Sequence, residues 1–262
     1  MNPDQFIHDR VRIAGRYILP SVRQLIFITE HGEPEPVGSC ALLWHRARRY
    51  LVSAAHVLDV FRSHPLSIGT ASSWHTLEGE FRATNVPATG KREDDAYDYA
   101  FMLLSDRDAS ALDGCHFLTA DQVASGETPI FNGQTRSKYL AIGWPRNRLN
   151  FDRRNKVTEP ENVAYTGAIA SSDLYRRHKR DPRIHLLVEF DRKQMSGPEG
   201  PRLPPSLDGL SGGGIFAMPG LQRVGDVAPP RLVAITTELW PQHDLLVGTR
   251  IDLVFAAIEA AA

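Results

Sequence analysis

The chain has 262 residues, a length that suits one large all-β domain or two small domains with buried cores. Its 30 Lys and Arg residues nearly balance its 31 Asp and Glu residues, so no overall field would attract nucleic acid or acidic lipid. The sequence has no apolar run of membrane-spanning length, and its first residues lack the basic and apolar pattern of a secretion signal. We therefore expect a cytoplasmic protein with no nucleic-acid or membrane partner.

The two cysteines, Cys40 and Cys115, are too few for a disulfide framework in a chain of this length. A free cysteine is most often a small buried residue. We expect both residues to be free thiols in a reducing compartment.

The predicted elements begin with a lead-in segment. Residues 1–19 have a loose helical pattern, which Pro20 would end. Apolar runs of strand length then follow at residues 25–28, 39–44, 50–53, 74–77, 79–83 and 99–104. A short helical turn is expected at residues 57–61.

A polar, irregular stretch over residues 106–133 precedes a second group of strands. This group covers residues 138–143, 162–170, 184–190, 213–218 and 231–237. Residues 249–260 predict a terminal helix, in which Thr249 caps the first turn and Asp252 complements its backbone N–H groups. Short runs at this spacing favour barrels or sandwiches over alternating βαβ units.

Three short strings carry residues of the kind that catalyse hydrolysis. They are Ser53-Ala54-Ala55-His56, Asp98-Tyr99-Ala100-Phe101 and Gly209-Leu210-Ser211-Gly212-Gly213. A serine hydrolase needs a hydroxyl, a base that takes its proton, and a carboxylate that orients the base. The third string also provides a glycine-rich turn, in which backbone N–H groups can converge on an oxyanion.

Each string is weak by itself. A histidine at a strand end is most often a structural residue, and a glycine-rich turn can hold a serine by chance. Asp94 and Asp95 compete with Asp98 for the carboxylate role, but they belong to the charged segment 91–95, which we interpret as a solvated turn. We therefore assign that role to Asp98, which opens an apolar strand.

In their order along the chain, the three strings resemble those of the trypsin-like, or chymotrypsin-fold, serine peptidase family. The resemblance extends from about Val37 to Ala260. It implies two six-stranded antiparallel β-barrels, with the catalytic residues in the cleft between them, and a C-terminal helix. The whole chain would form one peptidase domain, with a lead-in helix in residues 1–22, a first barrel over about 23–125 and a second barrel with the terminal helix over about 126–262.

The resemblance also implies a role for each motif residue. His56 would be the general base, Asp98 its orienting carboxylate and Ser211 the nucleophile. The backbone N–H groups of Gly209 and Ser211 would form the oxyanion hole. The substrate would be a protein or peptide, hydrolysed through an acyl-enzyme without a cofactor.

The strand over residues 234–238 resembles the strand that binds the substrate backbone in this family. Thr236, Thr237 and Glu238 would then bind substrate, and Thr236 falls where a small hydroxyl residue often supports the buried aspartate. Pro205 lies near the family's specificity position and gives no support for a preference for Arg or Lys. Glu238 would favour a basic group near the cleft or narrow the pocket.

The sequence also departs from the secreted members of the family. Leu210 precedes the nucleophile, where zymogen-activated members have an aspartate that pairs with a newly cut N-terminus. Val57 stands where secreted members have a cysteine, which leaves Cys40 without that partner. The chain is therefore more similar to bacterial, intracellular members that fold directly into their working form.

Other functions stay open at this point. Gly209-x-Ser211-x-Gly213 also fits the nucleophile elbow of an α/β-hydrolase, with Asp226 and His243 in the required order, although a strand pattern follows the serine. A non-catalytic binding module on a protease fold is another alternative. The sequence shows no zinc-binding spacing, so no metal is expected.

Two further features are hypotheses about partners. A regulatory protein would restrain an intracellular peptidase, but no residue points to it. The basic run Arg176-Arg177-His178-Lys179-Arg180 is most simply a solvated loop, with a docking patch or a self-cleavage site as alternatives.

Overall fold

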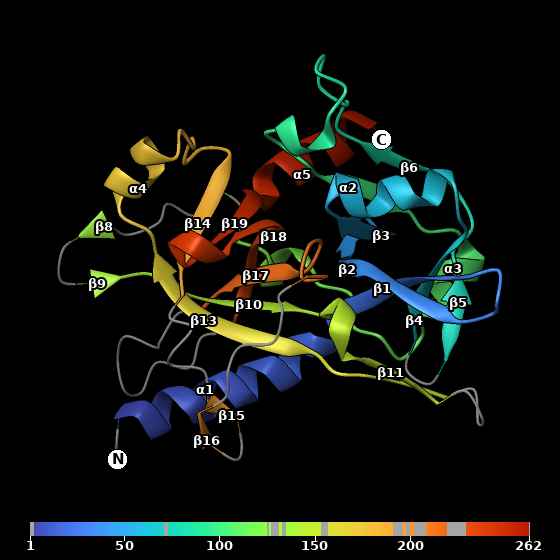
Figure 1. Cartoon of the computed structure of the whole chain (residues 1–262), viewed down its shortest axis with the longest axis horizontal. Helices are drawn as coiled ribbons and strands as arrows, with labels where there is room; N and C mark the ends of the chain where they lie inside the picture. Colours follow the sequence, from blue (N-terminus) through green and yellow to red (C-terminus); the bar gives the residue numbers. More distant parts are fainter. Residues whose placement is uncertain are drawn as a thin grey trace.

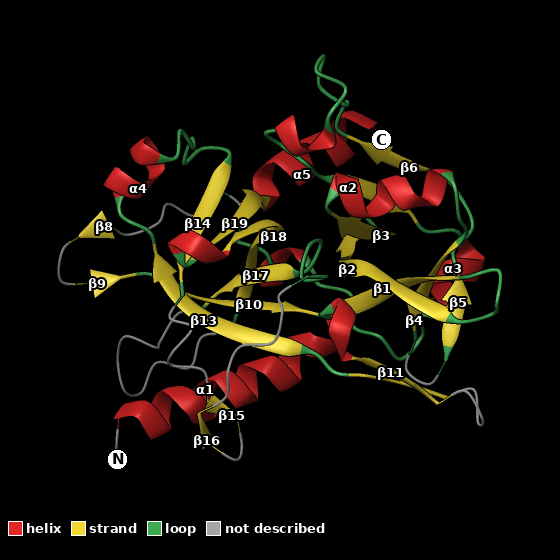
Figure 2. Ribbon diagram, in the orientation of Figure 1, coloured by secondary structure: helices red, strands yellow, loops and turns green. Residues whose placement is uncertain are grey.

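The computed structural model of the chain describes residues 3–70, 73–124, 126, 131–132, 135–152, 157–190, 196–197, 200–201, 208–218 and 229–261. A seven-stranded sheet and a closed barrel lie side by side, with helices at the two ends of the chain (Figure 1; Figure 2). Among the described residues, no helix is long and apolar enough to cross a membrane.

The chain starts with the expected helix, α1 (Pro3–Ile18). A 3-10 turn, η1 (Leu19–Ser21), follows it and contains Pro20, which has no N–H to continue the helix. Ala14 and Ile18 are buried on one side of α1, whereas Ile13 and Tyr17 are exposed. The helix therefore packs one face against the core.

The first half forms a seven-stranded sheet in the order β5-β4-β1-β2-β3-β7-β6. Its strands are β1 (Val22–Ile28), β2 (Pro34–His45), β3 (Arg48–Ser53), β4 (Leu66–Gly69), β5 (Trp74–Thr76), β6 (Phe81–Ala83) and β7 (Ala100–Leu103). All the expected runs form strands here. The sheet has one strand more than expected, and no ladder among the described residues joins its three-residue outer strands, β5 and β6.

The second half forms a closed barrel in the order β10-β13-β14-β19-β18-β17. Its strands are β10 (Lys138–Gly143), β13 (Val163–Ile169), β14 (His185–Glu189), β17 (Gly214–Ala217), β18 (Arg231–Trp240) and β19 (Leu245–Arg250). Three short ribbons flank the barrel: β8 (Phe131–Asn132) with β9 (Thr135–Arg136), β11 (Leu149–Asp152) with β12 (Val157–Pro160), and β15 (Ser196–Gly197) with β16 (Gly200–Pro201). The expected all-β class is confirmed.

Short helices connect the strands. They are α2 (Ala55–Leu58), η2 (Asp59–Arg62), η3 (Arg92–Asp94), α3 (Asp106–Ala111), η4 (Ala120–Gln122), η5 (Arg146–Arg148), α4 (Ser172–Arg177) and η7 (Pro241–His243). The stretch expected to be irregular after residue 106 thus contains α3. Ser105 and Asp108 form a capping box that starts this helix, a pattern that the sequence interpretation overlooked.

The terminal helix is confirmed as α5 (Ile251–Ala261). Its predicted cap is wrong, because Thr249 still belongs to β19 and its hydroxyl donates a hydrogen bond to the carbonyl of Tyr97. The side chain of Thr249 thus joins the barrel to the loop before β7.

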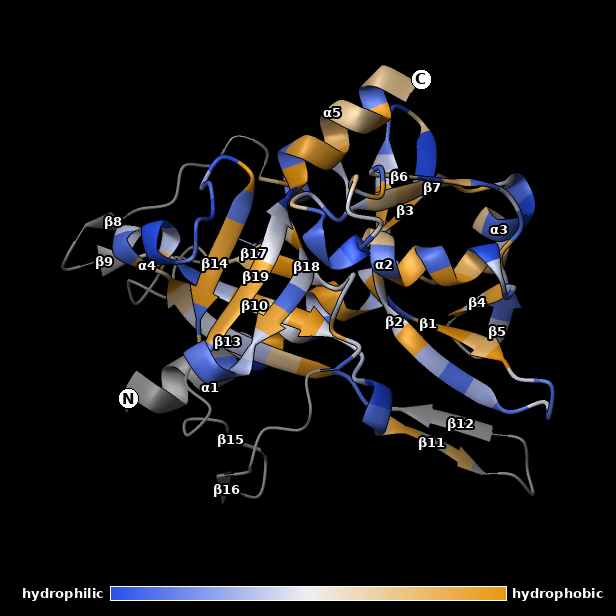
Figure 3. Ribbon diagram, turned by 45° about the horizontal axis from the view of Figure 1, so that its top comes forward, coloured by the Kyte–Doolittle hydropathy of each residue, from blue (hydrophilic) through white to orange (hydrophobic). Residues whose placement is uncertain are grey.

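A hydrophobic cluster connects the two halves. It combines buried side chains from the sheet (Leu43, Val52, Phe101), the barrel (Leu140, Phe216, Ile235) and the terminal helices (Ile18, Val254, Ile258). Figure 3 shows apolar residues along the strands of both halves and along α5. Burial of this shared apolar surface holds the sheet against the barrel.

Phe216 tests this shared core, because its side chain is fully buried in the cluster. We expect Phe216→Ala to lower the free energy of unfolding by about 3–5 kcal/mol, through lost burial and a residual cavity. Urea unfolding measures the change. The control is Leu103→Ala, at a side chain that is 47% exposed, which should change stability by less than about 0.5 kcal/mol. Equal effects of the two substitutions would contradict the assignment of the core.

Candidate active site

Two adjacent strand ends of the sheet place His56 beside Asp98. Strands β3 and β7 pair antiparallel, with Ser53 opposite Ala100. His56 lies in α2, directly after β3, and Asp98 lies in the loop directly before β7. The tight packing of Ala54 and Ala55, both fully buried, fixes the start of α2.

The two side chains form a dyad. The Nδ1 atom of His56 lies 2.7 Å from Oδ2 of Asp98, and the His56 backbone N–H donates to Oδ1 of the same carboxylate at 3.0 Å. The Ala55 N–H donates to the Asp98 carbonyl at 3.2 Å. Because a carboxylate accepts hydrogen bonds, this contact suits the neutral tautomer that carries its proton on Nδ1 and its lone pair on Nε2. This is the tautomer that a general base needs.

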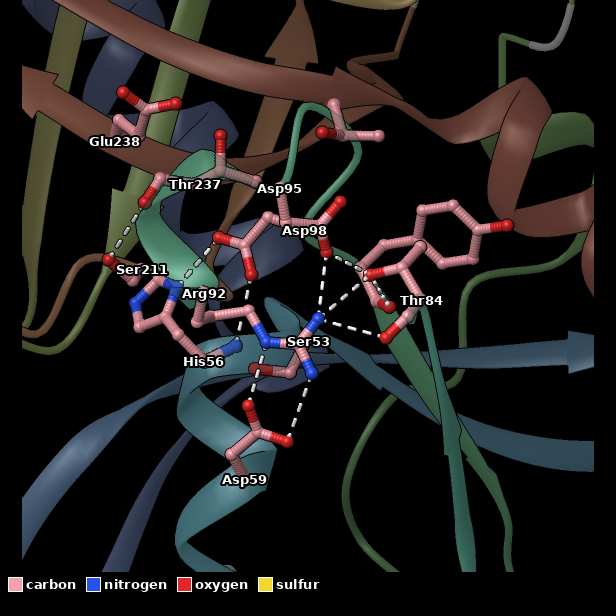
Figure 4. Close-up of polar contacts among 12 residues, drawn as sticks. Ser53, His56, Asp59, Thr84, Arg92, Asp95, Asp98, Ser211, Thr237 and Glu238 are labelled. Carbon is pink, nitrogen blue, oxygen red and sulfur yellow. Dashed lines mark hydrogen bonds and ion pairs between the residues drawn. The ribbon is translucent and has the colours of Figure 1, made fainter. Parts of the chain in front are cut away.

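Ser211 belongs to the other half of the molecule, in the turn before β17. Figure 4 shows its hydroxyl beside the ring of His56. The hydroxyl donates to the carbonyl of Thr237 at 3.2 Å, and within the described residues it makes no hydrogen bond with His56. The structure therefore brings the three predicted residues together, with the nucleophile hydrogen-bonded to the neighbouring strand β18.

Ser39 of β2 holds in place the turn that contains Ser211, the expected nucleophile. We call residues 208–213 the nucleophile turn. Its N–H donates to the Ser211 carbonyl at 2.8 Å, and its hydroxyl donates to the Gly209 carbonyl at 2.9 Å. The Trp144 N–H donates in turn to the Ser39 hydroxyl at 2.8 Å. One residue of the sheet thus fixes the turn that the barrel carries.

The glycines of the turn are required by close contacts. Gly212 has φ +83°, and a Cβ atom there would lie 2.0 Å from the Ser39 carbonyl oxygen. At Gly213, a Cβ atom would lie 2.3 Å from the Ile142 carbonyl oxygen. No other residue fits either position without a shift of the backbone.

The turn leaves two backbone donors available. Among the described residues, no acceptor takes the N–H of Gly209 or the N–H of Ser211. Gly209 has φ +97°, and its carbonyl is already occupied by Ser39. Two neighbouring donors with no acceptor among the described residues suit an oxyanion hole, which needs unpaired N–H groups close to the hydroxyl.

The strand beside the nucleophile contains the three expected substrate-binding residues. Strand β17 pairs with β18 as far as Ile235, and the turn before β17 pairs with Thr236, so that β18 has no ladder partner on this side beyond Thr236 among the described residues. Thr237 lies on this edge with its carbonyl toward Ser211. The hydroxyl of Thr237 donates to the Val247 carbonyl at 3.4 Å and so points into the barrel.

The expected support of Asp98 by Thr236 is absent. The Thr236 hydroxyl oxygen is buried and has no hydrogen-bond partner within the part of the chain that the structure describes, and the contacts of Asp98 there do not include it. The Thr236 backbone instead pairs with the nucleophile turn, accepting from Gly212 at 2.7 Å and donating to Gly213 at 2.8 Å. Because both hydrogen bonds are made by the backbone, they fix the position of Thr236 whatever its side chain contacts.

Glu238 has its own partners. Arg180 Nη2 donates to Oε1 of Glu238 at 2.6 Å, and Trp240 Nε1 donates to Oε2 at 2.9 Å. The Arg180 guanidinium also lies over the Trp240 ring, 5.0 Å from its centroid. The carboxylate of Glu238 is therefore neutralised inside the protein.

The basic run also differs from the expected solvated loop. Its first two residues belong to α4, and the Arg180 side chain is 17% exposed in the ion pair with Glu238. Pro205 and Asp226 lie outside the described residues. A strand, β17, follows Ser211, which contradicts the nucleophile elbow of an α/β-hydrolase.

Asp95 was wrongly interpreted as part of a solvated turn. It is buried, and it accepts hydrogen bonds from Arg92 Nη1 at 2.8 Å and from the Tyr97 N–H at 3.0 Å. The Thr84 hydroxyl also donates to it. Burial raises the pKa of Asp95, but these hydrogen bonds and one from the Asp98 N–H outweigh burial and hold the pKa below its usual value. The sequence signal was the spacing of Arg92 and Asp95, three residues apart.

The two cysteines are free thiols. Cys40 is fully buried, and burial raises the pKa of its thiol well above the usual range. A buried thiol of this kind is unreactive, so neither the geometry nor the chemistry points to a cysteine nucleophile.

A scan of the sequence against protein-family models finds no match, and a search of curated proteins finds none. Among solved structures, the chain is similar to neuropsin, a serine protease expressed in the limbic system of mouse brain. The TM-score is 0.59 over 92% of this chain and 94% of that chain. The chain has the chymotrypsin fold. Because the two sequences are only 14% identical, the comparison shows a shared fold and no more than that.

The glycine turn gives a direct test of the site. We expect Gly212→Ala to lower the free energy of unfolding by about 3 kcal/mol, because the new methyl group overlaps Ser39 and the backbone has a positive φ. Gly15→Ala is the matched control. No atom lies within 4 Å of its added Cβ, and it should stabilise α1 by up to about 1 kcal/mol. Urea unfolding of both variants measures the change in the free energy of unfolding. If Gly212→Ala leaves this free energy unchanged, the turn does not pack against Ser39 as described.

Thr236 provides a second test. Its buried hydroxyl has no partner, so we expect Thr236→Val to raise the free energy of unfolding by about 1 kcal/mol. Thr237→Val, which removes a bonded hydroxyl, should lower it instead. Thermal unfolding measures both. A loss of stability in Thr236→Val would mean that the hydroxyl supports Asp98 after all.

Proposed function

We propose that this protein is a serine endopeptidase that hydrolyses peptide bonds through an acyl-enzyme, with His56, Asp98 and Ser211 as its catalytic triad. The observation that carries the proposal is the His56–Asp98 dyad, with 2.7 Å between Nδ1 and Oδ2, beside the hydroxyl of Ser211. The chymotrypsin fold holds these residues at the junction of its two halves. The substrate would be a protein or a peptide.

The geometry supports the following sequence of steps. The Ser211 hydroxyl leaves the Thr237 carbonyl, turns to Nε2 of His56 and loses its proton to this nitrogen as its oxygen attacks the scissile carbonyl. Asp98 stabilises the resulting imidazolium, which then gives the proton to the leaving amine. Water then attacks the acyl-enzyme in the same two steps: His56 takes a proton from the water as it attacks, and then gives this proton to the Ser211 oxygen as the acyl group leaves. The N–H groups of Gly209 and Ser211 would stabilise the oxyanion.

The open edge of β18 suits an extended peptide. Beyond Thr236, β18 is paired with β19 on one side, and among the described residues no strand pairs with its other side, so the main chain of a substrate can add there. We assign Thr237 and Glu238 to this surface, whereas Thr236, which was expected to join them, has its backbone N–H and carbonyl bonded to Gly213 and Gly212. Since Arg180 neutralises Glu238, this carboxylate would not select for a basic side chain.

The nucleophile turn supports direct folding into a working form. Leu210 is buried in the barrel core, so the position directly before Ser211 offers no carboxylate to a newly cut N-terminus. The hydrogen bonds of Ser39 hold the turn without that pairing. We propose that the protein needs no N-terminal cleavage, as in the bacterial, intracellular members it resembles, and that its free thiols suit a reducing compartment such as the cytoplasm.

A second candidate is a binding module that uses the peptide-binding edge without catalysis. The hydrogen bond from Ser211 to Thr237, in place of one to His56, favours this candidate. The two candidates share the fold and differ in the reactivity of one hydroxyl.

Active-site labelling separates them. We expect a fluorophosphonate to label the purified protein at Ser211, because the reagent needs the activated hydroxyl and the oxyanion donors. A peptide library then reports cleavage and its preference. The Ser211→Ala variant should lose at least about 10⁴-fold in cleavage rate and keep its circular dichroism spectrum. Ser63→Ala, at an exposed serine in the sheet half of the molecule, is the control and should cleave normally.

Two results would count against the endopeptidase. An unlabelled wild-type protein that still binds peptides would indicate the binding module. Undiminished cleavage by Ser211→Ala would show that another residue is the nucleophile.

A further inference from the structure

A buried ion network lies directly behind the His56–Asp98 dyad (Figure 4). Its centre is Arg92, whose side chain is 13% exposed. On one side, Arg92 contacts Asp59 with two nitrogens, Nε to Oδ2 at 2.7 Å and Nη2 to Oδ1 at 3.2 Å. On the other side, its Nη1 donates to Asp95 Oδ2 at 2.8 Å and to the Thr84 carbonyl at 2.8 Å.

Asp59 connects this network to the base. It starts η2, which continues α2 without a break, and it stands three residues after His56. A two-nitrogen contact between guanidinium and carboxylate fixes distance and orientation together. Arg92 therefore adds a fixed contact to the helical segment that carries His56, beside the packing of its buried residues.

Asp95 connects the network to the orienting carboxylate. It accepts hydrogen bonds from the N–H groups of Tyr97 and Asp98. Asp98 has φ +40°, a conformation that non-glycine residues avoid unless neighbouring contacts hold them in it. The carboxylate of Asp95 provides one of those contacts, beside the hydrogen bonds that Asp98 accepts from the N–H groups of Ala55 and His56.

The dyad joins two segments that are 42 residues apart in the sequence, and Arg92 spans the same two segments through Asp59 and Asp95. We propose that Arg92 is a positioning residue of the active site, which holds the helical segment of His56 and the loop of Asp98 at the separation that their hydrogen bond requires. Its effect on rate rests on the proposed peptidase function. Arg92 itself touches neither substrate nor the reacting atoms.

The alternative is that Arg92 only stabilises the fold. Loss of a partly buried charge partner destabilises a protein in either case, because it leaves the buried Asp95 without its cation and Asp59 with Arg62 alone. A positioning residue has an additional effect, since a displacement of about 1 Å in a catalytic group can cost about 100-fold in rate. The two roles are therefore separated by kcat and by the state of the dyad in folded protein.

The test uses Arg92→Gln, which removes the charge and the two-nitrogen contact, and Asp59→Asn, which weakens the contact from its other end. Asp108→Asn is the matched control. Asp108 is a fully buried carboxylate of the same half. It accepts hydrogen bonds from the N–H groups of Glu78 and Ser105 and is hydrogen-bonded to Nε2 of His75, so among the described residues it has no contact with the Arg92 network. All variants are compared with wild type after urea unfolding has shown how much of each is folded.

Two measurements are made on the folded protein. Steady-state kinetics with a peptide substrate gives kcat and KM separately. Proton NMR in water follows the low-field resonance of the His56 Nδ1–H, which depends on its hydrogen bond to Asp98 and needs no substrate. We expect Arg92→Gln and Asp59→Asn to lower kcat by about 10-fold or more, to leave KM within about twofold, and to shift or broaden the resonance. Asp108→Asn should retain both properties.

The proposal is overturned if folded Arg92→Gln keeps the kcat and the resonance of wild type, if only KM changes, or if Asp108→Asn has the same effects. If Arg92→Gln does not fold, Asp59→Asn decides alone, since Asp59 is the more exposed partner. The resonance also separates this proposal from the peptidase function. A wild-type protein that cleaves nothing would refute the peptidase, whereas the NMR comparison would still decide the role of Arg92.

Discussion

The site depends on the contact that Ser39 makes across the junction of the two halves. His56 and Asp98, the proposed base and its carboxylate, belong to the sheet, and Ser211, the proposed nucleophile, belongs to the barrel. Ser39 uses its N–H, its hydroxyl hydrogen and a hydroxyl lone pair to connect Ser211, Gly209 and Trp144. Each of these bonds is short and buried, so water cannot compete for them. The shared hydrophobic cluster stabilises the junction, but Ser39 sets the register of the turn against the sheet.

Charged groups around the site are compensated inside the protein. Arg92 lies between Asp59 and Asp95, Arg180 pairs with Glu238, and Asp98 accepts from His56. A buried charge without a partner would be costly, and a mobile one would disturb the field at the dyad. Because Arg92 and Arg180 already have partners, we expect the proposed recognition of a peptide to depend on the main chain of β18 and on shape more than on charge.

The sequence predicts much of this arrangement for local reasons. Strand runs are visible because they alternate with turn residues, and the glycines around Ser211 indicate a turn that side chains cannot enter. The sequence does not predict the burial of Asp95. This carboxylate is buried because Arg92 and Thr84 donate hydrogen bonds to it, and these contacts form only in the folded chain. Thr249 and Thr236 were misassigned for a similar reason. Each has a hydroxyl whose partner, or lack of one, is set by strands that are distant in the sequence.

The glycines of the nucleophile turn also explain how a sequence so different from that of neuropsin can keep the same fold. At Gly212 the space for a side chain is filled by the backbone of β2, and at Gly213 by the backbone of β10. Backbone atoms are present whatever the sequence, so this restriction does not depend on which side chains surround the turn. Most other positions need only suitable volume and polarity, which many residues supply. Two chains with 14% identity can therefore share the fold over more than nine tenths of their length, while comparisons that rely on residue identity detect no relative.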